Sequence, residues 1–346
     1  MRGVHISLPL PRDETRVIDP VLRTCHGLME RGPVELEATV ERLREEIDRH
    51  IRRRLSERPD SRIVSSVLEG GKRLRPVFLM LVFEALGGKE RETALDVAYA
   101  LELAHNASLV HDDVIDMDLF RRGRPALWRR IGIGRAVIEG HRIINAAFST
   151  ALEKGVEIAR IFLEAWDKAS MGVLDEIVSS RPPSEMFYLR LIENKTGSLF
   201  AAAAESAAVC ADAPPELRAA LKRYGLLVGT VYQLADDVVD LVHRRSVPVS
   251  LSLLMRQLED AFAKAVIALR TGSLREALRF LRVPRNDLNF FTSLMERKLR
   301  ELDALVEELP IAPEGKEKLR LFPRYCVREM LREGRVRADE VQLLRL

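Results

Sequence analysis

The sequence predicts an all-α protein, a single large helical bundle, and three observations support this prediction. Of the 346 residues, 47% are hydrophobic, which is enough for a large packed core. Aromatic residues make up only 5%, whereas alanine, leucine, glutamate and arginine, which favour helices, are abundant. No stretch carries a convincing hairpin signal or the alternation of strands and helices that a parallel sheet requires.

The helices can be placed in order from apolar spacing and from glycine and proline breaks. Residues 33–57 carry opposite charges one turn apart, which favours a helix. A Gly-Gly pair starts a break at 70–76, and the stretch PVFLMLVFEALGG that follows indicates a buried helix ended by glycine. Further helices are predicted at 91–119, 133–170, 171–180, 184–210, 216–243, 250–281, 287–308 and 313–333, with a loop at 121–125.

None of the breaks resembles a long linker, so we expect one helical domain at 33–346 after an N-terminal extension at 1–32. The net charge of +3 gives no general attraction for nucleic acid. Cys25, Cys210 and Cys326 are isolated, which fits a reducing cytoplasm and favours neither a disulfide framework nor a zinc site. The N-terminus lacks the apolar stretch of a signal peptide, and no run of about 18 apolar residues predicts a membrane span.

The stretch LVHDDVIDMD, residues 109–118, places acids inside an apolar segment. On a helix, Asp112, Asp113 and Asp116 would direct their carboxylates into one small volume. The apolar neighbours predict burial, and crowded buried carboxylates resist ionisation unless cations compensate them. The alternative for a single motif of this kind is an acidic helix face in contact with water.

The same spacing recurs in YQLADDVVDLV, at Asp236, Asp237 and Asp240. Two copies on separate apolar helices are hard to explain by surface composition. Oxygen ligands with room for water suit Mg²⁺, which takes one or two carboxylates and completes its shell with water and substrate phosphates. If the two helices face each other, they could hold several magnesium ions around one diphosphate.

Basic tracts accompany the acidic motifs. The Gly-Gly pair of GGKRLRP lets backbone approach a ligand closely, and arginine grips phosphate oxygens in bidentate fashion. Any one of these tracts could be an ordinary solvated loop, but together with two acidic motifs they indicate a polyanionic substrate and a metal. The bases concerned are Lys72, Arg73, Arg75, Arg121, Arg122 and Lys195.

Four tracts carry a family resemblance: GGKRLRP, HNASLVHDDVIDMDLFRRGRP, KTGSLF and GTVYQLADDVVDL. In their order and approximate spacing, the chain resembles the trans-isoprenyl diphosphate synthases, the farnesyl and geranylgeranyl diphosphate synthase family. The resemblance implies a bundle of the isoprenoid synthase type with a central cavity. It also implies a magnesium-dependent prenyltransferase that condenses isopentenyl diphosphate with an allylic diphosphate, and a homodimer.

The resemblance further implies roles for individual residues. The magnesium ligands would be Asp112, Asp113, Asp116, Asp236, Asp237 and Asp240. The contacts to isopentenyl diphosphate would be Lys72, Arg75, His105 and Arg122. Arg121 and Lys195 would contact the allylic diphosphate, while Thr196 and Gln233 would face the developing carbocation. No nucleophilic side chain is needed, so the histidines of this region can be ordinary hydrogen-bonded residues.

The chain departs from the family pattern at three places. The loop after Asp240 lacks the family's Gly-Lys elements, and HRR at 243–245 is either a substitute charge or a solvated helix end. Val173 stands where the family has glutamine, and His141 where it has aspartate. These differences keep a second candidate open, a weakly active or regulatory subunit of a heteromeric prenyl synthase, although such subunits usually lack an acidic motif. A terpene cyclase would carry a different second motif, and a helical scaffold would leave the paired acids unexplained.

The residues before the first acidic motif bear on product length. Ala104, Ala107 and Ser108 are small, whereas a bulky aromatic residue there blocks the growing chain in the family that the sequence resembles. We therefore expect an open tunnel and a product of geranylgeranyl length or longer. The alternative is a floor supplied by another helix, for example by Phe148.

Overall fold

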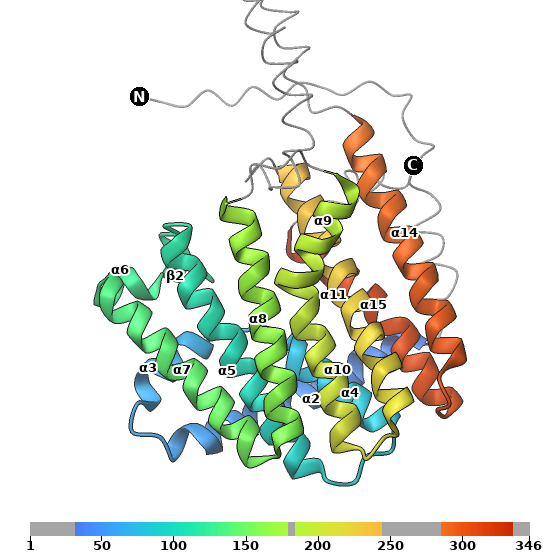
Figure 1. The fold of residues 1–346 in the computed structure, drawn as a ribbon, viewed down its shortest axis with the longest axis horizontal. Coiled ribbons are helices and arrows are strands. Elements are labelled where there is room, and N and C mark those ends of the chain that lie inside the picture. Colours follow the sequence, from blue (N-terminus) through green and yellow to red (C-terminus); the bar gives the residue numbers. More distant parts are fainter. Residues whose placement is uncertain (1–31, 179–183, 244–284, 335–346) are drawn as a thin grey trace, which may run out of the picture. The chain divides into compact units, whose positions relative to one another are not determined.

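The computed structural model describes residues 32–178, 184–243 and 285–334, and it confirms the all-α prediction (Figure 1). The helices in chain order are α2 (Gly32–Ser56), α3 (Ser61–Leu68), α4 (Leu74–Ala85), α5 (Arg91–Ile115), α6 (Leu127–Ile131), α7 (Ile133–Glu153), α8 (Val156–Val178), α9 (Glu185–Ile192), α10 (Ser198–Cys210), α11 (Pro215–His243), α14 (Arg285–Glu308) and α15 (Pro313–Glu333). The expected extension before residue 32 and the helix expected at 250–281 lie outside the described residues.

Two compact units can be distinguished. Among the described residues, the larger unit comprises 32–233 and 298–326, and the smaller one comprises 234–243, 285–297 and 327–334. The first acidic motif and all the basic tracts belong to the larger unit, and the second acidic motif belongs to the smaller one. Most of the candidate site can therefore be described within one unit.

The core of the larger unit is built around α4, as the unbroken apolar run in its sequence predicts. Every residue from Arg75 to Phe83 is buried, and α4 packs against α5, α10 and α2. The ring of Phe78 lies 5.6 Å from that of Phe200, 5.7 Å from that of Tyr224 and 5.0 Å from that of Phe322. Aromatic contacts of this kind bring α4, α10, α11 and α15 together.

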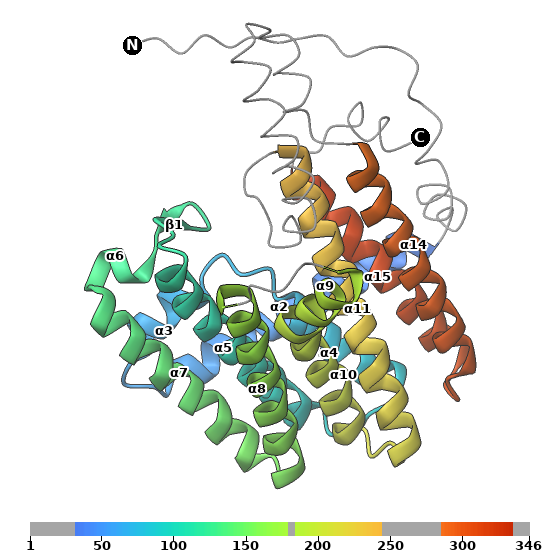
Figure 2. The same ribbon diagram turned by 45° about the horizontal axis from the view of Figure 1, so that its top comes forward.

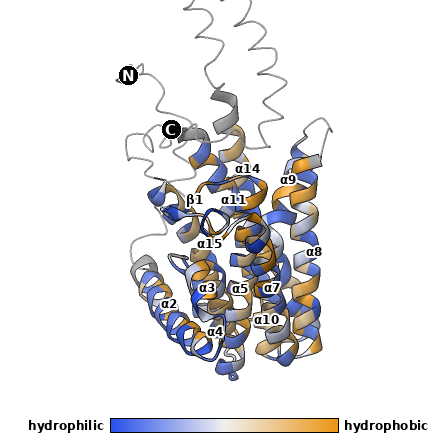
Figure 3. Ribbon diagram, turned by 90° about the vertical axis from the view of Figure 1, so that its left-hand side faces the viewer, coloured by the Kyte–Doolittle hydropathy of each residue, from blue (hydrophilic) through white to orange (hydrophobic). Residues whose placement is uncertain are grey.

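The outer helices bury only one stripe each. On α2 the stripe recurs every three or four residues, and the rest of its surface is hydrophilic (Figure 3). The buried stripe consists of Leu36, Val40, Leu43, Ile47 and Ile51. In the larger unit α5, α7 and α8 lie side by side, as Figures 1 and 2 show.

Several helix boundaries predicted from the sequence were wrong. The helix expected at 133–170 is two helices, because Gly155 adopts φ +130° between α7 and α8. The second of these helices, α8, runs without a break through most of the segment 171–180, which was expected to be a separate helix. The helix expected at 91–119 ends at Ile115. The two short helices α3 and α6 were not predicted.

The segment 121–125, expected to be a loop, contains a small hairpin instead. Strands β1 (Phe120–Arg121) and β2 (Arg124–Pro125) pair antiparallel, and Arg122 and Gly123 form the turn with φ values of 52° and 74°. Two successive residues with positive φ suit the right-handed twist of a tight hairpin. Strands of two residues are too short to show the alternation by which sequence reasoning finds a strand.

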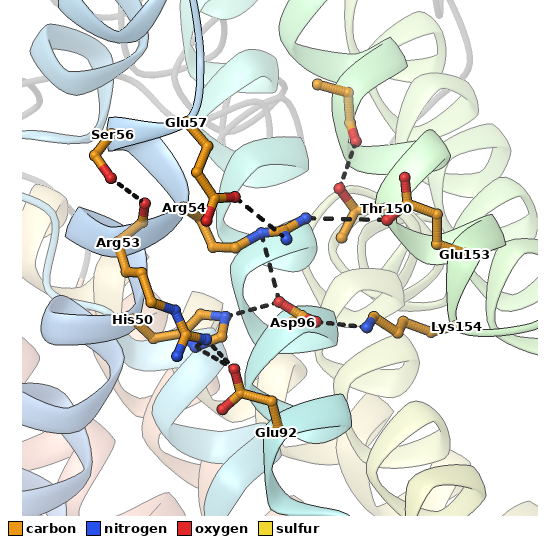
Figure 4. Close-up of polar contacts among 11 residues, drawn as sticks. His50, Arg53, Arg54, Ser56, Glu57, Glu92, Asp96, Thr150, Glu153 and Lys154 are labelled. Atoms are coloured by element: carbon orange, nitrogen blue, oxygen red, sulfur yellow. Dashed lines mark hydrogen bonds and ion pairs between the residues drawn. The ribbon is translucent and has the colours of Figure 1, made fainter.

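A buried ionic network holds the first half of α5 to its neighbours (Figure 4). Asp96 is 4% exposed; it accepts a hydrogen bond from His50 Nε2 at 2.9 Å, and Lys154 Nζ lies 2.5 Å from its other oxygen. Burial opposes ionisation of Asp96, but the hydrogen bonds from Lys154 and His50 outweigh burial and hold its pKa below the usual range. The network joins α2, α5 and the corner between α7 and α8, so it fixes the helix that carries the first acidic motif.

Candidate active site

The first acidic motif occupies the last turn of α5 and the residue that caps it. Asp113 is buried at 3% exposure, Asp112 is half-buried, and Asp116, which follows the last helical residue, is exposed. The prediction that all three carboxylates are buried was therefore wrong for Asp116. The reason is that α5 ends inside the motif, so that Ile115 and Met117 are also 47% and 54% exposed.

The surroundings of the motif disfavour negative charge. Burial raises the pKa of Asp112 to about 6, although Lys195 opposes the shift. Asp116 is more exposed, but partial desolvation by the surrounding protein still raises its pKa, again against the influence of Lys195. The pKa of Asp113 is raised by burial too, even though Arg121 Nε donates a hydrogen bond of 2.7 Å to its Oδ1. Carboxylates in this state would be stabilised by an added cation.

These residues fit a magnesium ion by their chemistry, since the three carboxylates offer only oxygen ligands. Within residues 32–178, 184–243 and 285–334, no three His, Cys, Asp or Glu side chains gather into a cage that could hold a metal ion. In proteins magnesium takes one or two carboxylates and completes its shell with water and substrate oxygens.

Lys195 and Thr196 lie on a one-turn π-helix, Glu193–Gly197, between α9 and α10. Such π-turns often occur at functional sites. Lys195 Nζ pairs with Glu176 of α8; burial opposes the charge on Lys195, but Glu176 outweighs burial and raises the lysine pKa. Thr196 Oγ1 donates a hydrogen bond of 2.7 Å to Gln233 Oε1 on α11. The structure thus brings all three predicted catalytic residues into one region of the larger unit.

Gly172 of α8 makes this arrangement possible. A Cβ atom at Gly172 would lie 2.6 Å from the backbone nitrogen of Lys195 and 2.9 Å from its Cα. Only a residue without a side chain allows α8 and the π-turn to approach so closely. The glycine therefore sets the position of Lys195 relative to Glu176 and the acidic motif.

Arg75 is a buried cation that forms no ion pair with a carboxylate of the described residues. Its Nη1 donates a hydrogen bond of 3.0 Å to His105 Nε2, its guanidinium lies 4.9 Å from the ring centre of Phe200, and its Nε has no partner. Burial lowers the pKa of Arg75, and burial followed by the charge of Arg75 holds the pKa of His105 well below its usual value. A neutral His105 accepts from Arg75, so the positive charge of Arg75 remains available to an anion.

Arg73 contrasts with Arg75 although both belong to the same tract. Arg73 adopts φ 54° at the start of α4, its Nε donates to Asp48 at 2.8 Å, and its Nη1 donates to Glu102 at 2.9 Å. The charge of Arg73 is therefore balanced inside the protein. The buried acid Glu102 also accepts from Asn106 Nδ2 at 2.9 Å. Sequence reasoning did not find Glu102, because nothing in the pattern distinguishes it from other helix acids.

The remaining predicted phosphate contacts surround the same region. Arg122 donates to the backbone oxygen of Glu69 at 3.1 Å, and its positive charge reaches His105 together with those of Arg121 and Arg73. Lys72 is exposed in the turn that precedes α4. The structure thus brings Arg75, His105, Arg121 and Arg122 close together, and Arg121 links this group to Asp113 of the acidic motif.

A mostly apolar cavity of about 370 Å³ lies next to Asp112 and Lys195, between α5, α7, α8 and α10. Its wall includes Ser108 and Ile115 of α5, His141 of α7, and Trp166 and Val173 of α8. Phe148, the residue considered as a possible floor, packs edge-on against Trp166 with 6.2 Å between ring centres. Both residues at which the chain departs from the family pattern, His141 and Val173, therefore belong to the cavity wall.

The second acidic motif lies on α11 with the predicted helical spacing. Asp237 is 6% exposed, and Asp236 and Asp240 are half-buried. All three belong to the smaller unit, and the prediction that they face the first motif stays a prediction. His243 is the last residue of α11, while the basic pair at 244–245 lies outside the described residues.

The polyprenyl synthetase family model matches residues 60–247 of the chain. The chain is 36% identical over 180 residues to a geranylgeranyl diphosphate synthase of Methanosarcina mazei, an alignment that covers 50% of this chain and 55% of the relative. It is 31% identical over 253 residues to a (2E,6E)-farnesyl diphosphate synthase of Mycobacterium bovis, covering 69% and 68%. The chain thus spans about half the length of several relatives that it matches.

Solved structures share the fold. A geranylgeranyl pyrophosphate synthetase from Pyrococcus horikoshii superposes with a TM-score of 0.68 at 23% identity, over 85% of this chain and 99% of that one. A polyprenyl synthase from Caulobacter crescentus, solved in complex with calcium and isoprenyl diphosphate, superposes with a TM-score of 0.63 at 23% identity, over 92% and 99%. At this level of identity the likeness shows the helical architecture of the isoprenoid synthases.

Proposed function

The chain belongs to the polyprenyl synthetase family, and on that basis we propose that it is a magnesium-dependent prenyltransferase that condenses isopentenyl diphosphate with an allylic diphosphate. One observation carries the proposal above all. A carboxylate with a raised pKa, Asp112, and a cation, Lys195, lie together on the wall of a mostly apolar cavity. Such a cavity suits a molecule that joins a diphosphate to a hydrocarbon chain.

We assign the diphosphate sites according to how each charge is balanced. Arg75 and His105, with Lys72 and Arg122, would bind isopentenyl diphosphate, because Arg75 is a buried cation that pairs with no acid of the described residues. Lys195 and Arg121 would bind the allylic diphosphate, because both cations lie beside the first acidic motif: Arg121 pairs with Asp113, and the charge of Lys195 reaches Asp112. Hydrogen bonds from charged bases to phosphate oxygens are stronger than those between neutral groups.

The magnesium ligands would be drawn from the six motif aspartates, Asp112, Asp113, Asp116, Asp236, Asp237 and Asp240. Bound magnesium would supply positive charge that stabilises diphosphate as a leaving group. Asp113 is held by Arg121 at 2.7 Å, so it orients that arginine in addition to any role as a ligand. The raised pKa of Asp112 supports its assignment, because a cation would remove the cost of its charge.

The reaction proceeds without a nucleophilic side chain. The allylic carbon–oxygen bond breaks as diphosphate leaves, the double bond of isopentenyl diphosphate attacks the carbocation, and a proton passes to the departing diphosphate. Thr196 donates its hydrogen to Gln233, so its oxygen lone pairs remain available to stabilise positive charge nearby. The apolar cavity wall excludes water, which would otherwise capture the carbocation.

The expected product has geranylgeranyl length or more. Ser108 is the first residue of α5 on the cavity wall, and its small side chain leaves room below the acidic motif. Trp166, backed by Phe148, is the largest side chain on the opposite wall and would limit further growth. Farnesyl diphosphate as the sole end product would refute the assignment of product length.

A homodimer is supported by one face of α8. Exposed apolar residues recur along it at Val156, Leu163 and Met171, with exposures of 67%, 54% and 47%. Arg160 and Asp167 lie in the same stripe, and in the described part of the chain neither has an ion pair. If two copies of α8 pair antiparallel about residues 163–164, Arg160 of one copy faces Asp167 of the other, as a two-fold interface requires.

The dimer can be tested by reversing these charges. Arg160→Glu should convert a dimer to a monomer in sedimentation equilibrium, because two acids would then face each other. The double variant Arg160→Glu with Asp167→Arg should restore the dimer, because it restores opposite charges across the two-fold axis. A monomeric wild-type protein would refute the dimer, and a dimeric Arg160→Glu variant would refute this interface.

The proposed activity is tested by incubating the purified protein with magnesium, isopentenyl diphosphate and each allylic diphosphate. Elongation of a C10, C15 or C20 primer is the expected result, and Arg75→Gln should weaken it while leaving the fold intact. A folded protein that elongates no primer alone, but raises the activity of a second prenyl synthase subunit, would favour the regulatory alternative. That alternative is favoured by Val173 and His141, which line the cavity where the family has glutamine and aspartate. A cytoplasmic location is part of the same proposal.

A further inference from the structure

One exposed corner of the larger unit, at the end of α5, carries apolar side chains to which the proposed reaction gives no role. Four apolar side chains within residues 115–120 are exposed: Ile115, Met117, Leu119 and Phe120, at 47%, 54%, 52% and 60%. They precede the hairpin and α6, at one edge of the larger unit in Figure 2. Soluble proteins seldom expose so many apolar side chains together unless the surface binds something. The residues 115–120 with α6 are called the apolar corner below.

The corner has a fixed geometry. Trp128 Nε1 donates a hydrogen bond of 2.8 Å to the backbone oxygen of Asp118, and the backbone nitrogen of Ala126 donates one of 3.1 Å to the oxygen of Leu119. Arg129 donates to the same Leu119 oxygen at 3.3 Å and lies 5.0 Å from the ring centre of Phe120. The apolar side chains are therefore presented on an anchored platform formed by α6.

The corner and the residues that follow it carry a net positive charge. Residues 115–138 contain six arginines and two acids, Asp116 and Asp118. Arg121 is paired with Asp113, and Arg124 is paired with Glu69. Arg129 and Arg130 of α6 are exposed, and neither forms an ion pair with any described residue. Two exposed arginines thus border the apolar side chains; of the two acids in the segment, Asp118 pairs with Arg121 and Asp116 is exposed.

We propose that the apolar corner docks on the surface of an anionic lipid bilayer. Apolar side chains bordered by arginines are the composition of an interfacial anchor, in which the side chains enter the headgroup region and the arginines meet lipid phosphates. A second copy of the chain does not suit this surface, because a two-fold pairing would bring like arginine charges together. Single-stranded nucleic acid binds through stacked aromatic rings, whereas this corner exposes mainly aliphatic side chains.

The position of the corner beside the cavity suggests what docking would do for the release of a product. Ile115 is exposed and also lines the cavity, so the apolar corner adjoins the cavity, and we infer that the cavity opens beside it. Docking would place that opening against the bilayer, where a long hydrocarbon chain can leave without crossing water. This use rests on the proposed function, but docking itself does not. In the described part of the chain no helix is long and apolar enough to span a membrane, so the attachment would be peripheral.

Docking can be measured by co-sedimentation of the full chain with vesicles, without substrate or magnesium. The protein should pellet with vesicles of phosphatidylglycerol and phosphatidylcholine, and it should remain in solution with vesicles of phosphatidylcholine alone. Arg129→Gln with Arg130→Gln should weaken binding about thirtyfold, since each arginine near an anionic surface contributes about 1 kcal/mol and about 1.4 kcal/mol is tenfold. Leu119→Ser with Phe120→Ser should weaken it at least as much.

A matched control removes equally exposed apolar side chains elsewhere. Leu152→Ser with Met186→Ser replaces residues that are 57% and 80% exposed, and binding should be unchanged. All variants change surface residues, so their circular dichroism and elongation activity in detergent should match those of the parent. The proposal is overturned if the wild type does not bind anionic vesicles, if it binds RNA instead, or if the control loses binding as much as the corner variants.

Discussion

Replacing Gly172 by alanine tests whether the site depends on the close approach of α8 to the π-turn. The new Cβ would meet the backbone nitrogen and Cα of Lys195 at 2.6 Å and 2.9 Å, closer than carbon side chains approach backbone atoms. Backbone atoms cannot rotate out of the way as a flexible side chain can. The π-turn must therefore move away from α8, and Lys195 must move with it.

Two opposing effects decide the change in stability. Alanine favours a helix over glycine by up to about 1 kcal/mol, whereas overpacking a tight contact costs about 1–3 kcal/mol. The overlap is with backbone on a second helical element, so the steric cost should win, and we expect a net loss of about 1 kcal/mol. Displacing Lys195 should also remove a charge-assisted contact of about 1.5–3 kcal/mol, which lowers kcat/KM about 10- to 100-fold.

The assay pairs urea denaturation with steady-state elongation kinetics. Gly134→Ala is the matched control, because Gly134 also lies in a helix and a Cβ there would meet nothing within 4 Å. That control should be as stable and as active as the parent, or slightly more stable. If Gly172→Ala is as stable and active as Gly134→Ala, the tight contact does not position Lys195, and the reasoning fails.

Three further predictions follow from the charges. Arg75→Gln should raise KM for isopentenyl diphosphate at least tenfold with little loss of stability in urea. Arg73→Gln should mainly destabilise the folded protein, because it leaves the buried Glu102 without its arginine partner. If Arg75→Gln lost as much stability as Arg73→Gln, the contrast between the two arginines would be contradicted. The pKa of Asp112 is raised to about 6, so without magnesium its ionisation destabilises the folded state above that pH. Asp112→Asn should therefore be more stable than the parent in urea at pH 8 and lose that advantage toward pH 4. The same variant should abolish elongation. The pKa of Asp96 is lowered in the folded protein, so ionised Asp96 stabilises the fold above the pKa of the unfolded carboxyl, and this stabilisation is lost as the pH falls through the folded pKa. Asp96→Asn should therefore lower the urea midpoint at pH 7. The difference from the parent should shrink at low pH.

Local pattern was enough to predict most of the helices. Apolar spacing and terminal signals located α2, α4, α11, α14 and α15 to within a few residues, because helix formation depends on neighbours three and four residues away. The same signals missed the break at Gly155, since one glycine inside a helical pattern is tolerated in many helices. The hairpin at 120–125 was missed because its strands have only two residues each.

The residue types of the site were also predictable from sequence, since repeated DDxxD spacing, a Gly-Gly tract and an arginine pair each have a chemical reason. Their individual states were not. Arg73 and Arg75 are two residues apart in one tract, yet Arg73 is neutralised by Asp48 and Glu102 while Arg75 is left for an anion. That difference depends on acids 25 and 29 residues away from Arg73 along the chain.

The sequence by itself determined the helical architecture and the family, because both depend on short-range periodicity and on motifs that can be read in order. Only the tertiary structure decided that Lys195 meets Glu176, that Thr196 meets Gln233, and that Asp116 reaches the surface. The physical reason is that burial and charge balance are set by side chains from distant segments. A residue's pKa and its freedom to bind a ligand follow from those neighbours.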